Sequence, residues 1–173
     1  MWRLTEVASW VYSTTQIRWY NNPICEKPLS TNKADYDINF ENSATFEIKK
    51  EITELDLFKK SDNTEIRKIA SKLHNVLKDV PNCYLHGYII YEAVRDYIEE
   101  IRDSKNTINI VDIGTAKGYS ALVMAKALKD NRQDGKVMTF DVIPNRKKMY
   151  WNGPTDITHG KQTRLELLEE WKK

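Results

Sequence analysis

The residues best suited to chemistry form one short segment, which runs Asp112-Ile113-Gly114-Thr115-Ala116-Lys117-Gly118-Tyr119-Ser120. Gly114 and Gly118 let the backbone come close to a ligand and tolerate positive φ angles, because glycine has no Cβ. A second carboxylate, Asp141, lies at the end of the next β-branched run. A carboxylate in that place can accept hydrogen bonds from both ribose hydroxyls of an adenosine ligand. The spacing therefore predicts a site for an adenosine-containing ligand.

Two other glycine motifs can be tested on the same residues. The dinucleotide fingerprint G-x-G-x-x-G needs glycine at positions 116 and 119, which hold Ala116 and Tyr119. The phosphate loop G-x-x-x-x-G-K-[ST] needs glycine at 119 followed by lysine. Both motifs are excluded, which argues against a ligand with a bulky pyrophosphate at this turn.

Two strands and a helix must position these residues. The β-branched run 107–113 predicts a strand, the alanine-rich run 121–128 a helix, and residues 136–142 a second strand. Such an order forms a βαβ unit with parallel strands and a right-handed crossover, and ligands bind beyond the carboxyl ends of its strands. The predicted fold class is α/β, with a Rossmann-like βαβ unit.

The chain is predicted to divide into a helical N-terminal region, 1–105, and a partial Rossmann-like cofactor-binding unit, 106–173. Apolar spacing predicts an amphipathic aromatic helix within 1–29, helices near 46–58, 64–77, 84–103 and 161–171, a loop over 30–45, and an aromatic loop over 149–154 that packs against the domain. The helix near 84–103 is expected to bury Ile90, Val94, Tyr97, Ile98 and Ile101 and to expose Glu92, Arg95, Glu99 and Arg102.

The glycine segment resembles a known family. Asp112-x-Gly114-x-x-x-Gly118, followed by Tyr119-Ser120-Ala121 and an acidic residue that closes the next strand, resembles the first two motifs of class I S-adenosylmethionine-dependent methyltransferases. The Gly-Tyr-Ser-Ala ending is similar to catechol-type and other small-molecule O-methyltransferases, and the run after Asp141 is similar to methyltransferases of sugar-modifying pathways. Ala116 departs from the many members that carry a third glycine there. The resemblance implies O-methyl transfer to a small molecule or a saccharide.

The resemblance also implies that S-adenosylmethionine is the cofactor. Asp112 would orient its methionine part through the ammonium group, the turn would wrap the methionine and ribose, and Asp141 would hold the ribose hydroxyls. His86 and Gly87 would line the same pocket. The predicted cofactor-binding residues are Asp112, Gly114, Thr115, Ala116, Lys117, Gly118, Tyr119, Ser120, Asp141, His86 and Gly87.

The catalytic residues are not assigned by the sequence. Methyl transfer is an in-line displacement in which positioning supplies most of the acceleration, and a base is needed only to take a proton from the acceptor. His86 and His159 are the better candidates for that base, whereas His74 is expected on the solvated side of a helix. Cys25 and Cys83 lack metal-ligand spacing and are interpreted as structural thiols, and no metal site is expected.

Composition excludes several classes of protein. The 173 residues include 27 Lys plus Arg against 25 Asp plus Glu, which gives a net charge of +2. This balance produces no large field of one sign, so the charge does not indicate nucleic acid or an anionic membrane as a partner. No stretch has the roughly 20 apolar residues needed to span a bilayer, and no signal peptide is recognised at the N-terminus. A cytoplasmic protein with reduced thiols is expected.

The predicted sheet is incomplete relative to the family. A class I methyltransferase core resembles a seven-stranded sheet, and this sequence offers two strands, which leaves an apolar face and two edges to be covered. The expectation is therefore a truncated methyltransferase, with a homo-oligomer as one way to cover the sheet. A non-catalytic, partner-binding remnant of such an enzyme and another adenosine- or nucleotide-binding α/β protein remain open as alternatives.

Overall fold

The computed structural model describes residues 27–44, 64–77, 82–102, 107–143 and 145–172. The helix predicted near 46–58, and the aromatic helix predicted within 1–29 except for its last three positions, lie outside these residues. The described elements are, in chain order, α2 (Lys33–Ala44), α5 (Thr64–Leu73), α6 (His86–Glu100), β1 (Ile108–Ile113), α7 (Tyr119–Asp130), β2 (Gly135–Phe140), α8 (Thr155–His159), α9 (Arg164–Leu167) and the 3₁₀ helix η3 (Glu169–Trp171).

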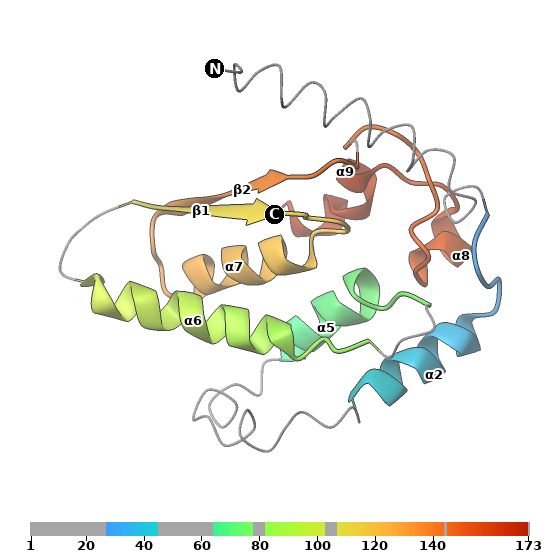
Figure 1. Cartoon of the computed structure of the whole chain (residues 1–173), viewed down its shortest axis with the longest axis horizontal. Coiled ribbons are helices and arrows are strands. Elements are labelled where there is room, and N and C mark those ends of the chain that lie inside the picture. The colour runs from blue at the N-terminus through green and yellow to red at the C-terminus, as the bar shows by residue number, and fades with distance from the viewer. Residues whose placement is uncertain (1–26, 45–63, 78–81, 103–106, 144, 173) are drawn as a thin grey trace, which may run out of the picture.

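The centre of the fold is the predicted βαβ unit, which confirms the α/β class. Strands β1 and β2 pair in parallel, in a register that runs from Ile108 opposite Gly135 to Ile113 opposite Phe140. Helix α7 connects them and packs on one face of the sheet, and α6 lies against α7 on the side away from the strands (Figure 1). Helices α8 and α9 lie beyond the carboxyl ends of the strands (Figure 1). This arrangement puts the glycine turn between the sheet and the C-terminal helices.

The loop predicted over 30–45 is wrong, because most of it forms helix α2. Tyr36, Phe40 and Ser43 are buried and recur at helical spacing, so tertiary contacts stabilise a segment whose composition is mostly polar. The side chain of Asn32 also accepts a hydrogen bond from the Ala34 amide at 3.1 Å, which supports the start of the helix.

The helices predicted near 64–77 and 84–103 are confirmed as α5 and α6, although α5 already ends at Leu73. Two residues of α6 lie on the opposite side of the helix from the one expected. Glu92 is fully buried, where it pairs with the neighbouring Arg95, and Tyr97 is 52% exposed. The buried aromatic residue is instead Tyr91, whose hydroxyl donates a 2.7 Å hydrogen bond to Asp130 at the end of α7. Helix α6 therefore packs on α7 through a partly polar contact.

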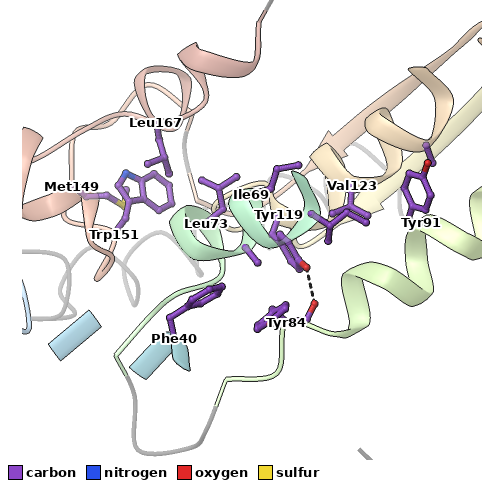
Figure 2. Packing of buried hydrophobic residues seen from close by; sticks show 13 residues of the cluster. Phe40, Ile69, Leu73, Tyr84, Tyr91, Tyr119, Val123, Met149, Trp151 and Leu167 are labelled. Atoms are coloured by element: carbon purple, nitrogen blue, oxygen red, sulfur yellow. Dashed lines mark hydrogen bonds between the residues drawn. The ribbon is translucent and has the colours of Figure 1, made fainter. Parts of the chain in front are cut away.

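Aromatic side chains from α2, from the start of α7 and from the segment before α6 pack together in one core cluster (Figure 2). Tyr119, the first residue of α7, is buried and donates a 2.6 Å hydrogen bond to the carbonyl of Tyr84. The Tyr84 ring stacks on Phe40 of α2 with 5.0 Å between the ring centroids. Gly87 allows this packing, since a Cβ there would lie 2.0 Å from the Tyr119 hydroxyl oxygen. Gly87 is thus required by close packing.

The helix predicted over 161–171 is broken into α9 and η3, and α8 precedes it. Thr163 starts α9 with a capping box, because its side chain accepts from the Glu166 amide and the Glu166 carboxylate accepts from the Thr163 amide. The expectation that the aromatic loop 149–154 packs against the domain holds for Trp151, which is buried and donates a 2.9 Å hydrogen bond to the Gln162 carbonyl.

One face of the two-stranded sheet is exposed within the described part of the chain. Val111 and Met138 form one cross-strand pair on this face, and Ile113 and Phe140 form the next. Their exposed fractions range from 42% for Met138 to 84% for Ile113. Parallel sheets are normally covered on both faces, so this apolar face departs from the rule.

Candidate functional site

The glycine turn between β1 and α7 has a strained backbone. Gly114 and Gly118 have φ angles of +83° and +97°, and Ala116 has a φ angle of +47°. Glycine adopts such angles freely, whereas alanine does so at a cost. The Gly118 amide donates a 2.7 Å hydrogen bond to the Thr115 carbonyl and closes the turn. The positive angle at 116 explains why a glycine would be suited to the position where this sequence departs from the family.

The turn forms one wall of an open cleft of about 270 Å³. The opposite wall comes from the end of α5, the segment that follows it and the start of α6. The cleft is lined by Leu73, His74, Val76, Asn82, His86, Gly114, Thr115, Ala116, Lys117, Tyr119 and Ser120. The structure therefore brings the predicted residue His86 to the predicted glycine turn, although 28 positions separate it from Gly114 in the chain.

His74 belongs to this cleft, so its expected place on a solvated helix side is wrong. Helix α5 ends at Leu73, and the His74 ring lies 4.8 Å from the His86 ring and 5.1 Å from the Tyr119 ring, centroid to centroid. The His86 Nδ1 lies 2.7 Å from the Cys83 carbonyl oxygen, which can only accept. Nδ1 therefore carries the proton of neutral His86, and Nε2 is left to accept one.

Asp112 lies directly behind the cleft wall. Its side chain is buried, and its Oδ1 accepts a 2.9 Å hydrogen bond from the hydroxyl of Ser120, which lines the cleft. Its Oδ2 is buried without a hydrogen-bond partner in the described part of the chain. An unpaired buried carboxylate oxygen is costly. This orphaned acceptor fits the role implied for Asp112, which is to receive an ammonium group.

Asp141 is not among the residues that line the cleft. Only 5% of its side chain is exposed. Its Oδ2 accepts a hydrogen bond from the Ala116 amide in the turn, and its Oδ1 accepts one from the Ile143 amide at 2.8 Å. Arg164 of α9 approaches the same Oδ2 with its Nη2 at 3.1 Å. In this structure Asp141 therefore braces the turn and pairs with an arginine.

Arg164 is a site residue that the sequence did not indicate. Its side chain is 4% exposed, and its Nη1 donates a 2.7 Å hydrogen bond to Asn145. Burial lowers the pKa of Arg164, while the negative charges of Asp141 and Asp112 act in the opposite direction. A lone arginine in a charged helix carries no sequence signal of burial, so only the tertiary structure could reveal it.

Lys117 anchors the turn to two other segments. Its side chain is buried, and its Nζ donates a 3.3 Å hydrogen bond to the Asn75 carbonyl. A Cβ on Gly153 would lie 2.3 Å from the same nitrogen, which places the ammonium group against the loop before α8. Burial lowers the pKa of Lys117 to about 8, although the nearby Asp156 raises it. The Lys117 side chain thus connects the glycine turn to Asn75 and to the loop before α8.

The remaining candidates lie apart from the cleft. Gly87 is buried under Tyr119 and does not line the cavity. His159 is exposed at the end of α8, where its Nδ1 lies 2.7 Å from the Thr158 hydroxyl. His86 is therefore the predicted base candidate that the structure places beside the turn. Asn82 and His74 are cleft residues that sequence reasoning missed, because both lie outside regular elements and approach the turn only in the folded chain.

The fold and the cleft define a Rossmann-like βαβ unit with a glycine turn at the carboxyl ends of parallel strands. A family model described as O-methyltransferase matches residues 89–155. The matched segment includes Asp112, the turn and Asp141 and ends before Arg164. The match confirms the predicted resemblance, and this part of the chain is O-methyltransferase-like. No curated protein and no solved structure matches the chain.

The helices give one further finding. None of those in the described ranges is both long enough and apolar enough to span a membrane.

Proposed function

We propose that the protein is an S-adenosylmethionine-dependent methyltransferase that transfers a methyl group to a hydroxyl of a small molecule or a saccharide, in the cytoplasm. The observation that carries the proposal is that the turn of the O-methyltransferase-like segment and His86 line the same cleft. The orphaned Asp112 oxygen beside that cleft supports an ammonium-bearing ligand.

The residues of the site have distinct proposed roles. Asp112 Oδ2 accepts a hydrogen bond from the ammonium group of the methionine part, and Ser120 keeps the carboxylate in place through its bond to Oδ1. The positive φ angles at Gly114 and Gly118 expose the turn to the ligand. When bound, the cofactor supplies an electrophilic methyl group on a sulfonium sulfur. His86 Nε2 takes the proton from the acceptor hydroxyl, because Nδ1 is held by the Cys83 carbonyl.

Two glycines provide a matched test of the cofactor site. Gly114 and Gly160 both have positive φ angles, and an added Cβ would meet nothing within 4 Å at either position, but only Gly114 lines the cleft. Gly114→Ala should cost about 1 kcal/mol of stability, and Gly160→Ala about 1–3 kcal/mol, because a φ of +63° with a ψ of −143° is a conformation that essentially only glycine adopts. We expect Gly114→Ala to weaken the binding of S-adenosylhomocysteine by at least tenfold in titration calorimetry, and Gly160→Ala to leave it unchanged. Equal affinities in both variants would contradict the proposed site.

The exposed sheet face supports a second role for the same chain, as a self-associating protein. Val111, Ile113, Met138 and Phe140 form a contiguous apolar surface on two paired strands. We propose that a second copy of the chain covers this surface. The oligomer does not replace the methyltransferase proposal, because the exposed face and the cleft belong to different parts of the structure.

A further inference from the structure

The C-terminal segment covers the place where the ribose of the cofactor is expected. Arg164 pairs with Asp141, and the side chain of Leu168 lies against Gly118, where an added Cβ would come within 3.1 Å of it. Arg164 belongs to α9, and Leu168 follows it directly. Together they contact Asp141, which follows β2, and Gly118 of the turn that follows β1. The segment therefore covers the turn and the carboxylate together.

The hydrogen-bonding capacity of Asp141 is largely used in this arrangement. Oδ2 accepts a hydrogen bond from the Ala116 amide, and Oδ1 accepts one from the Ile143 amide. The Arg164 Nη2 forms an ion pair with the same Oδ2 at 3.1 Å, so a further donor to this oxygen would meet the guanidinium. With 5% of the side chain exposed, no space remains at Asp141 for a ribose ring. A ligand with two vicinal hydroxyls can reach this carboxylate only if Arg164 moves away.

The other ion pairs of this segment are exposed. Among the described ion pairs of this segment with other parts of the chain, Lys148 pairs with Glu166 and Lys72 pairs with Glu170, and each of these side chains is more than one-third exposed. Exposed ion pairs contribute little to stability. The buried Nε and Nη2 of the guanidinium make no hydrogen bond in the described structure, although Nη2 is in ion-pair contact with Asp141. Release of the Arg164 side chain from Asp141 therefore breaks one buried ion pair and the hydrogen bond to Asn145, whereas the buried Leu167 keeps α9 packed in the core.

We propose that Arg164 is a built-in competitor for the ribose-binding carboxylate, so that its side chain must leave Asp141 before the cofactor binds. This inference rests on the proposed function, since it concerns the same site. Its consequence is quantitative. If the uncovered state makes up about one-tenth of the molecules, the apparent affinity for the cofactor falls about tenfold below that of an uncovered site.

The test compares variants that weaken the cover with a control in the same segment. Arg164→Met removes the guanidinium but keeps a long side chain, and Leu168→Ala weakens the contact with Gly118 without changing Asp141. Lys148→Met removes an exposed positive charge that pairs with α9. Titration calorimetry with S-adenosylhomocysteine should show about tenfold tighter binding for Arg164→Met, a smaller gain for Leu168→Ala, and no change for Lys148→Met. Circular dichroism verifies that each variant is folded.

Ligands with and without ribose hydroxyls identify the atom group involved. Adenosine should gain affinity from Arg164→Met, whereas 2′,3′-dideoxyadenosine should not, because it has no hydroxyls to compete for Asp141. Equal binding of S-adenosylhomocysteine by the wild type and both cover variants would overturn the competition and leave the proposed function intact. Weaker binding by folded Arg164→Met and Leu168→Ala would also overturn it. If no variant binds S-adenosylhomocysteine, the proposed function fails and this inference fails with it.

Discussion

Lys117 gives a sharp test of how the glycine turn is held in place. Replacement of Lys117 by methionine keeps an unbranched apolar chain and removes the buried ammonium group. The pKa of Lys117 falls from an ordinary 10.5 to about 8 in the folded protein, because burial disfavours the charge. A difference of about 2.5 pKa units, at about 1.4 kcal/mol each, corresponds to a destabilisation of about 3 kcal/mol when both states are protonated.

The sign of the pH dependence follows from proton binding. Between pH 8 and 10 the unfolded chain keeps the lysine proton that the folded chain has released, so the free energy of unfolding rises with pH. The rise expected from Lys117 over this interval is about 2 kcal/mol. Above about pH 10 the effect is opposed, because burial raises the pKa of Tyr91 and Tyr119 in the folded protein and the unfolded chain loses those protons first. The informative window is therefore pH 8 to 10.

The assay is urea unfolding followed by circular dichroism at several pH values in this window. The wild type and Lys136→Met, which removes an exposed lysine of β2, should show the rise in stability. Lys117→Met should lack the part of this rise that comes from Lys117. The variant also loses the hydrogen bond to the Asn75 carbonyl and leaves Asp156 without its cation, so the slope against pH, and not the absolute stability, is compared. Equal slopes of unfolding free energy against pH in Lys117→Met and the wild type would refute the account of a buried, weakly paired lysine.

Three further predictions concern the core, the sheet face and the proposed base. Gly87→Ala should destabilise the protein by about 2–3 kcal/mol in urea unfolding, because the new Cβ overlaps the Tyr119 hydroxyl; the gain of about 0.5–1 kcal/mol that a Gly-to-Ala change ordinarily gives in a helix would show that the ring moves freely. Ile113→Thr combined with Phe140→Thr should reduce self-association in sedimentation velocity, with Ile38→Thr, which is on exposed α2, as the control; a wild-type monomer at all concentrations would contradict the proposed oligomer. His86→Gln should lower kcat for methyl transfer by about 10²-fold or more while S-adenosylhomocysteine binding stays within a few-fold, and an unchanged kcat would remove His86 from the proton transfer.

The βαβ unit and its turn were predictable because their signals are local. A β-branched run, two glycines four positions apart and an alanine-rich helix specify the order of elements, and the parallel pairing follows from the crossover. Asp112 lies at the end of β1 for the same reason, since it is next to the turn in the chain, while its role in binding stays a prediction. The positions of residues whose surroundings are set by neighbouring sequence were therefore predictable.

The surroundings of the turn were not predictable from local patterns. Helix α2 was missed because Tyr36 and Phe40 form a sparse apolar stripe among polar residues, and their burial in the folded chain helps to stabilise it. His74 joins His86 because α5 ends earlier than its apolar spacing indicated. The pairing of Arg164 with Asp141 joins two charged residues through a fold in which α9 returns to the strand ends.

The most direct test of the central claim is a titration of the purified protein with S-adenosylmethionine, S-adenosylhomocysteine, ATP and NAD under the same conditions. A cleft that is formed by the glycine turn and that has no pyrophosphate-binding motif should give saturable heat with the first two ligands at one site per chain, and none with ATP or NAD at equal concentrations. No heat with S-adenosylhomocysteine, or tighter binding of ATP or NAD, would contradict a sulfonium-cofactor site and favour another function for the βαβ unit.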